Sequence, residues 1–204
     1  MRDETGSAAD RRPGDRGPEA NSRLTAMTAV VLFVLLAIEG VTVLRVRSLL
    51  SVHVLIGTAL VPPVLLKVGS TGYRFARYYL GAPAYRRKGP PPPLLRLLGP
   101  VVVVSTLSLL ATGVVLMFVG PGLRGPALML HKASFVVWFG AMVFHVLGHL
   151  VETARVAPRD WVRRTRADVA GAGARQWAVA ASLGLGAVFG ALLMGRAAGW
   201  PVHP

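Results

Sequence analysis

The sequence LHKASFVVWFGAMVFHVLGHL, residues 130–150, decides how the rest of the chain is interpreted. Its apolar residues extend over the roughly 20 residues that a helix needs to cross the hydrocarbon core of a bilayer. Three histidines lie within it, His131, His145 and His149. Ligating or ionisable side chains are costly inside a membrane span, so they are kept mainly where they have a function. The stretch therefore predicts a transmembrane helix with a functional face.

Four further apolar stretches of similar length accompany this one. Of the 204 residues, 53% are hydrophobic and only 16% are charged, and the charges lie almost entirely between the apolar stretches. A soluble domain of this size rarely has such a composition. We expect an all-α, polytopic membrane helical bundle with spans at about residues 24–44, 49–69, 98–119, 127–150 and 177–196.

The expected domain organisation follows from these spans. The first segment is rich in Gly, Pro, Asp and Arg without an apolar period, which predicts a disordered tail. It is followed by a four-helix membrane domain, a basic loop, and a fifth transmembrane helix with a short tail. The corresponding ranges are 1–22, 23–152, 153–176 and 177–204.

Two local patterns predict how the helices are shaped and packed. Gly186 and Gly190 have the GxxxG spacing that permits close approach to a neighbouring helix. Pro62 and Pro63 remove helix hydrogen bonds in the second span, so we expect a kink there.

The distribution of basic residues predicts the orientation. The N-terminal tail and the second and fourth connections hold 18 Lys and Arg residues, and the opposite side holds five. This asymmetry predicts a cytoplasmic N-terminus and an external C-terminus in the inner (plasma) membrane. Topology and attraction to the anionic lipid bilayer also explain most of the net charge of +14, so we expect no nucleic-acid binding.

His53 in the second span and His131 in the fourth have matching positions. The two spans run in the same direction, and each histidine lies about four residues, or roughly 6–8 Å, inside the external boundary. Two imidazoles at equal depth on neighbouring parallel helices are what bis-histidine haem ligation requires. The chain has no cysteine, which excludes thiolate metal sites and covalent haem attachment. We therefore expect haem b with iron bound by His53 and His131.

Three neighbouring residues are candidate haem contacts. Gly57 follows His53 by four residues, on the face where a porphyrin needs a helix without a side chain, although ordinary helix packing would also explain it. Arg47 and Lys132 lie at the same external end and are candidate partners of the haem propionates. The alternative for both is a role as interfacial anchors.

His145 and His149 form a second group on the face of His131. His145 is 14 residues from His131, which corresponds to about 21 Å along a helix, the separation of two haems stacked across a bilayer. The matching position in the second span is Lys67, a rare haem ligand, so the second haem site is incomplete. The alternatives for His145 and His149 are a quinone site, a proton path or, more weakly, a metal site.

Glu39 lies near the external end of the first span, three residues before Thr42. One interpretation is a proton carrier for quinol chemistry near the haem. The other is an interface carboxylate that pairs with Arg45 or Arg47.

The motifs SVHVLIG, residues 51–57, and residues 130–150 give the chain a family resemblance. From about residue 24 to 150 it resembles the membrane b-type cytochromes of the cytochrome b561 and respiratory cytochrome b kind, whose four helices hold haem through histidines. The resemblance implies electron transfer between the quinone pool and a redox partner, commonly an external or membrane-bound oxidoreductase. The chain departs from the di-haem pattern because its second span has a single histidine.

The expected function is therefore that of a membrane-embedded haem b electron-transfer subunit, rather than a stand-alone catalyst. The alternative is a non-redox scaffold or assembly subunit of a larger complex, in which the histidines only form hydrogen bonds between helices.

Overall fold

The computed structural model describes residues 16–89 and 92–196, and the regular secondary structure of these residues is entirely helical. This confirms the all-α prediction. In chain order the elements are α1 (Arg16–Leu44), α2 (Val46–Ala59), α3 (Val61–Tyr79), α4 (Pro83–Lys88), α5 (Pro93–Leu116), α6 (Pro121–Val156), the 3-10 helix η3 (Ala157–Asp160), α7 (Arg163–Arg166) and α8 (Ala172–Met194).

Five helical segments are long and apolar enough to cross a membrane. They are Arg16–Leu44, Val46–Tyr79, Pro93–Leu116, Pro121–Asp160 and Ala172–Met194. Each extends beyond its expected limits by several residues on at least one side. The chain is thus a bundle of the multi-pass membrane type, as its composition predicts.

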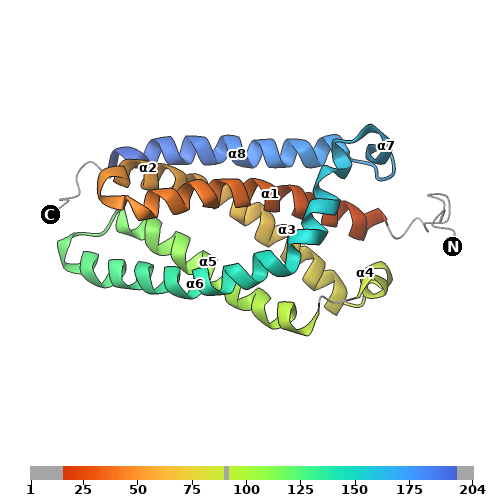
Figure 1. Ribbon diagram of the computed structural model, residues 1–204, viewed down its shortest axis with the longest axis horizontal. Coiled ribbons are helices and arrows are strands. Elements are labelled where there is room, and N and C mark those ends of the chain that lie inside the picture. The colour runs from red at the N-terminus through yellow and green to blue at the C-terminus, as the bar shows by residue number, and fades with distance from the viewer. Residues whose placement is uncertain (1–15, 90–91, 197–204) are drawn as a thin grey trace.

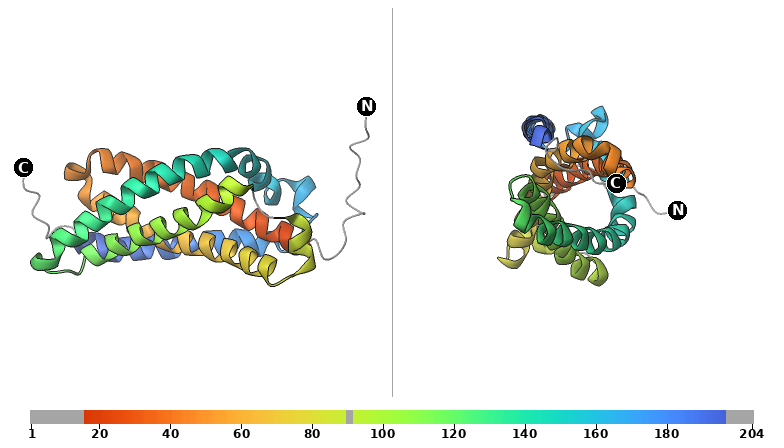
Figure 2. Two further views of the ribbon diagram at one scale, coloured as in Figure 1. Left: turned by 90° about the horizontal axis from the view of Figure 1, so that it is seen from below. Right: turned by 90° about the vertical axis from the view of Figure 1, so that its left-hand side faces the viewer.

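The five long segments lie side by side along one axis (Figures 1 and 2). We call the end at which α1 begins the N-side and the opposite end, at which α8 ends, the C-side. The segment formed by α2 and α3 runs from the C-side to the N-side, and α6 does the same (Figure 1). They are therefore parallel.

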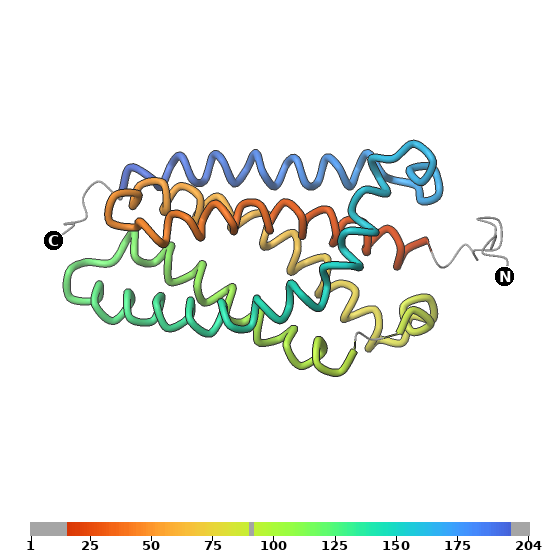
Figure 3. Tube along the Cα trace, in the orientation of Figure 1, coloured from red at the N-terminus to blue at the C-terminus, as the bar shows by residue number. Residues whose placement is uncertain are grey.

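The second span is interrupted at Leu60, two residues before the proline pair. Leu60 separates α2 from α3 and is itself buried against Leu32 and Val64. Its backbone remains bonded on both sides, because its N–H donates to the Ile56 carbonyl at 2.9 Å and its carbonyl accepts from the Val64 N–H at 3.0 Å. Figure 3 shows the two segments continuing from the C-side to the N-side. The expected break is present at the place that the prolines indicate.

Helix α8 packs on the outside of the bundle against α2 and α3 (Figure 1). Gly186 and Gly190 are buried in this contact, so the GxxxG prediction is confirmed. A Cβ atom at Gly186 would lie 2.3 Å from the carbonyl oxygen of Ala59, and one at Gly190 would lie 2.5 Å from that of Leu55. Only glycine permits the two backbones to approach this closely.

This close approach leads to a first prediction. Gly186→Ala is expected to push α8 away from α2, because the atom it would meet is backbone and cannot rotate aside. We expect a loss of about 1–3 kcal/mol, the usual cost of overpacking, measured as a lower thermal midpoint in detergent. Gly184→Ala is the matched control, since its Cβ would meet nothing within 4 Å. Equal stability of the two variants would contradict this packing.

The N-side end is more ordered than its composition indicates. Helix α1 begins at Arg16, so residues 16–22, expected to belong to a disordered tail, are helical, while residues 1–15 lie outside the described residues. Glu19 accepts hydrogen bonds from Arg23 at 3.3 Å and Arg159 at 3.0 Å, and Asn21 donates to the Ser70 carbonyl at 2.9 Å. These tertiary bonds supply order that an isolated polar segment lacks.

The expected basic loop at 153–176 is also structured. Helix α6 continues to Val156, and η3 and α7 follow before α8 starts at Ala172. Asp160 in η3 is fully buried and accepts from Arg175 on α8 at 2.5 and 2.8 Å and from Arg23 on α1 at 3.0 Å. One carboxylate therefore joins three elements distant in sequence. Residues 197–204, the expected C-terminal tail, lie outside the described residues.

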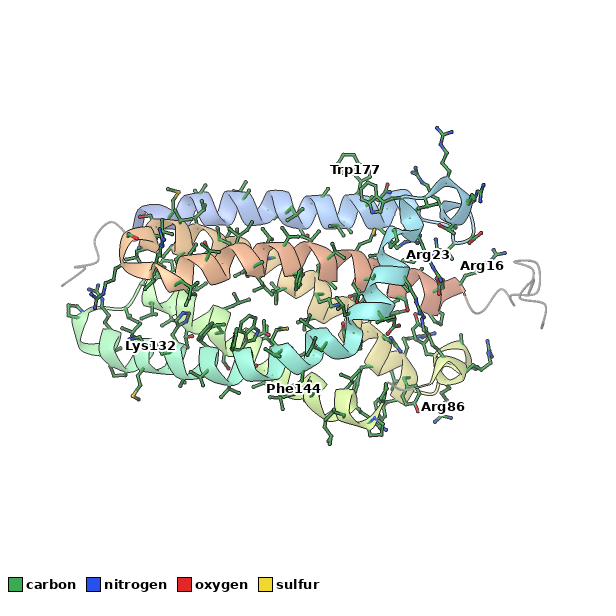
Figure 4. The ribbon with its side chains drawn as sticks, in the orientation of Figure 1. Arg16, Arg23, Arg86, Lys132, Phe144 and Trp177 are labelled. Carbon is green, nitrogen blue, oxygen red and sulfur yellow. The ribbon has the colours of Figure 1, made fainter. Side chains whose placement is uncertain are left out.

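The outer surface of the long helices is apolar. Figure 4 shows Phe144 pointing away from the bundle, and this side chain is 64% exposed. Other large exposed apolar residues on the same helix are Val136, Phe139, Leu147 and Leu150. Such a surface is unfavourable in water and matches the hydrocarbon interior of a bilayer.

Candidate functional site

The imidazole rings of His53 and His131 face each other across the C-side half of the bundle. His53 lies on α2 and His131 on α6, and both are partly buried. Their ring centroids are 6.4 Å apart, with an angle of 84° between the ring planes. Ligation of one iron by both histidines requires that the two rings lie close together. They do so because each helix is rotated about its long axis with its histidine toward the other helix.

Each ring has partners on its own side. For His53 these are on α1: Nδ1 lies 2.8 Å from a carboxylate oxygen of Glu39 and 3.0 Å from the hydroxyl of Thr42. The single hydroxyl proton of Thr42 can be donated to the Glu39 carbonyl, 2.7 Å away, or to the other oxygen of the Glu39 carboxylate, 3.0 Å away. Glu39 is only 12% exposed at its side chain. The carboxylate is thus held between the hydroxyl and the imidazole.

The partners of His131 are on α5 and are uncharged. Its Nδ1 lies 3.1 Å from the backbone carbonyl of Leu109 and 3.1 Å from the hydroxyl of Thr112. That hydroxyl is 2.7 Å from the Ser108 carbonyl and donates its proton there, which leaves a lone pair for the imidazole.

These partners determine where the protons of both imidazoles lie. A carboxylate and a backbone carbonyl only accept hydrogen bonds, so Nδ1 carries the proton in His53 and in His131. When such a ring is neutral, its Nε2 atom has a lone pair that can bind a metal. Histidines that bind a metal commonly donate their other N–H to a carboxylate or a backbone carbonyl, which is the pattern found here.

The distance between the rings also matches two axial ligands on one metal. Two metal–nitrogen bonds of about 2 Å each, with roughly 1 Å from each nitrogen to its ring centre, place the ring centres about 6 Å apart. The measured separation is 6.4 Å. A haem iron takes only two ligands from the protein, so this pair is a sufficient donor set.

Two glycines make room next to these rings. A Cβ at Gly57 would lie 3.0 Å from the carboxylate oxygen of Glu39, so this glycine accommodates the partner of His53. Gly113 on α5 makes room for the ring of His131 itself, because a Cβ added there would lie 3.2 Å from Cε1 of that ring. Gly57 was expected to face a porphyrin, and the contact that the structure places against it is the glutamate.

Arg47 lies at the start of α2 (Val46–Ala59), Lys132 lies eleven residues after the start of α6 at Pro121, and both are exposed in the C-side half of the bundle. Figure 4 shows Lys132 toward the C-side, opposite Arg16, Arg23 and Arg86 at the N-side. The two residues share the end of the bundle that contains the His53–His131 pair, as the sequence indicates. Their proposed contact with propionates stays a prediction.

The second histidine group lies toward the N-side on α6. The rings of His145 and His149 are 4.8 Å apart, and His149 lies 3.7 Å from the Glu152 carboxylate. The Nδ1 atom of His145 is buried and has no hydrogen-bond partner among the described residues. Lys67 on α3 donates to the backbone carbonyl of Thr25 at 2.8 Å. Its amino group is therefore bonded to α1.

A bare metal ion finds no ready site in the described part of the chain. No group of three or more His, Cys, Asp or Glu side chains among residues 16–89 and 92–196 is arranged to hold one. Two histidines could serve as axial ligands only to a metal whose other donors come with the bound group, as in a porphyrin.

Sequence reasoning missed the α5 contribution. Thr112, Gly113 and the Leu109 carbonyl complete the surroundings of His131, yet the third span contains no histidine or charge to draw attention to it. The Thr–Gly pair in an apolar run is the available signal. Glu39 was expected to act in proton transfer or to pair with Arg45 or Arg47, and its carboxylate instead lies 2.8 Å from Nδ1 of His53.

Comparison of the chain with family models, curated proteins and solved structures found no match. The functional argument therefore rests on the geometry of the site.

Proposed function

We propose that the chain is a membrane-embedded electron-transfer subunit that holds one haem b between His53 and His131. The observation that carries the proposal is the 6.4 Å separation of two rings whose Nδ1 atoms are both bonded away from the shared space. Axial ligation through Nε2 needs an Nδ1 atom that is bonded elsewhere, and both Nδ1 atoms are bonded in this way.

The residues of the chain would hold and orient this cofactor. Glu39 and Thr42 set the proton position of His53, and the Leu109 carbonyl and Thr112 do so for His131. Bound haem b supplies a centre that accepts and donates one electron. Arg47 and Lys132, exposed at the same end, are the proposed propionate partners.

We further propose a quinone and a redox protein as the electron donor and acceptor, in either order. The buried, unpartnered Nδ1 atom of His145 supports a polar ligand such as a quinone headgroup in the N-side half. A second haem with His145 is less well supported, because Lys67 stands at the opposing position and is bonded to Thr25. The excess of basic residues supports an inner-membrane location with the N-side in the cytoplasm.

One observation favours a second candidate, a non-redox scaffold. His53 joins α2 to α1 and His131 joins α6 to α5 through hydrogen bonds that need no cofactor. In a membrane, interhelical bonds of this kind contribute to helix association. A scaffold would keep both bonds, and nothing would bind between the rings.

An optical spectrum distinguishes the two functions. Protein purified in detergent from haem-replete cells is expected to be red and, after dithionite reduction, to show the Soret and α bands of a six-coordinate b haem. Pyridine haemochrome analysis should give about one haem per chain. Colourless, folded protein would contradict the haem proposal and favour the scaffold.

A further inference from the structure

The two rings of the pair differ in the charge of their partners. His53 is bonded to a carboxylate, whereas His131 is bonded to a backbone carbonyl and a hydroxyl. Bis-histidine ligation requires neither arrangement in particular. The charge of the partner of His53 can therefore affect the reduction potential of a bound haem as well as its affinity.

The carboxylate of Glu39 has two polar contacts and an open space beside it on the facing helix. The Thr42 hydroxyl lies 3.0 Å from one carboxylate oxygen, and His53 donates to the other at 2.8 Å. Gly57, on the facing helix, leaves room for that second oxygen, because a Cβ there would lie 3.0 Å from it. The side chain is 12% exposed, so bulk water screens it little.

We propose that Glu39 is a positioning residue that lowers the midpoint potential of the haem through His53. A negative charge close to the metal favours the ferric over the ferrous state, because the ferric iron carries one more positive charge. A carboxylate that accepts the Nδ1 proton also increases the electron donation of the imidazole to the metal. Both effects act in the same direction. This inference rests on the proposed haem site.

The residues around His131 provide an internal comparison. Thr112 contacts Nδ1 of His131 at 3.1 Å, as Thr42 contacts Nδ1 of His53 at 3.0 Å. Removing the Thr112 hydroxyl leaves the bond to the Leu109 carbonyl and changes no charge. The effect of charge at Glu39 is thereby separated from the effect of losing a hydrogen bond.

The test is a redox titration of the haem-loaded protein in detergent, followed at the α band. Glu39→Gln keeps the size of the side chain and removes its charge. We expect its midpoint potential to rise so that the ferrous-to-ferric ratio at a fixed ambient potential increases about tenfold, which for one electron is 59 mV. Thr112→Val is expected to change this ratio less than threefold, and Glu39→Asp, which keeps the charge, to lie nearer the wild type.

A spectroscopic measurement accompanies the titration. The ferric low-spin signal in electron paramagnetic resonance reports the strength of the axial ligand field, so it should shift in Glu39→Gln and not in Thr112→Val. A merely structural role for Glu39 would move neither this signal nor the potential of the haem that remains bound.

The outcomes separate this inference from the proposed function. If Glu39→Gln binds haem with the potential and signal of the wild type, the inference is wrong and the haem site stands. If Glu39→Gln binds no haem, Gly57→Ala replaces it, since the added Cβ displaces the carboxylate without removing it. An unshifted potential in Gly57→Ala would then overturn the inference. A wild type without haem would overturn the site itself.

Discussion

Replacing His53 or His131 with alanine is expected to remove the six-coordinate b-haem spectrum. Each variant deletes one of the two facing imidazoles and leaves its partners, Glu39 with Thr42 or the Leu109 carbonyl with Thr112, in place. Loss of only a hydrogen-bond partner of a metal ligand typically costs 10–100-fold in metal affinity, and loss of the ligand should cost more. We expect haem per chain to fall at least tenfold, measured by pyridine haemochrome analysis.

His145→Ala and His149→Ala are the matched controls for this experiment. They remove histidines from the same helix, α6, but from its N-side half, where their rings contact each other and not His53. Both variants should keep the spectrum. If His145→Ala bleached the protein while His131→Ala did not, the ligand pair would be misassigned. If no histidine variant changed the spectrum of a red protein, the iron would be held elsewhere.

Asp160→Ala is expected to cause the largest loss of stability that does not alter the haem. The side chain is fully buried and is the shared acceptor for Arg23, itself 0% exposed, and Arg175. Removing it leaves the buried Arg175 guanidinium without its carboxylate partner, and leaves Arg23 with Glu19 at 3.3 Å and Asp168 at 3.9 Å. Breaking a buried ion pair in this way costs about 3 kcal/mol or more, and here three elements lose their common contact. The thermal midpoint in detergent should fall accordingly.

Asp168→Ala is the matched control for charge. Asp168 is 24% exposed at its side chain and lies 3.9 Å from Arg23, so its contribution is screened and should stay below about 1 kcal/mol. Figure 4 shows Arg23 of the Asp160 cluster at the N-side and Lys132, the neighbour of His131, toward the C-side. The haem spectrum of both variants should therefore remain that of the wild type. An equal loss of stability in the two variants would show that the buried Asp160 stabilises the protein no more than the partly exposed Asp168.

The main helical architecture was predictable because a bilayer imposes the same requirement on every span. Apolar length alone located five helices, and the proline pair located the break at Leu60. Helix ends were less predictable. Residues 16–22 and 153–176 are polar, and polarity indicates disorder when no partner is known. Their order depends on Asp160 and Glu19, which accept bonds from residues more than 130 positions away.

Part of the candidate site was likewise predictable from the sequence, and part was not. The sequence by itself predicted that His53 and His131 lie in the same half of two parallel spans, and their ring centroids are 6.4 Å apart. Only the tertiary structure decided that Glu39, Thr112 and the Leu109 carbonyl bond to them. Those contacts depend on the rotation of α1 and α5 about their own axes. Rotation is set by the packing of all the helices together, which no periodicity within one span encodes.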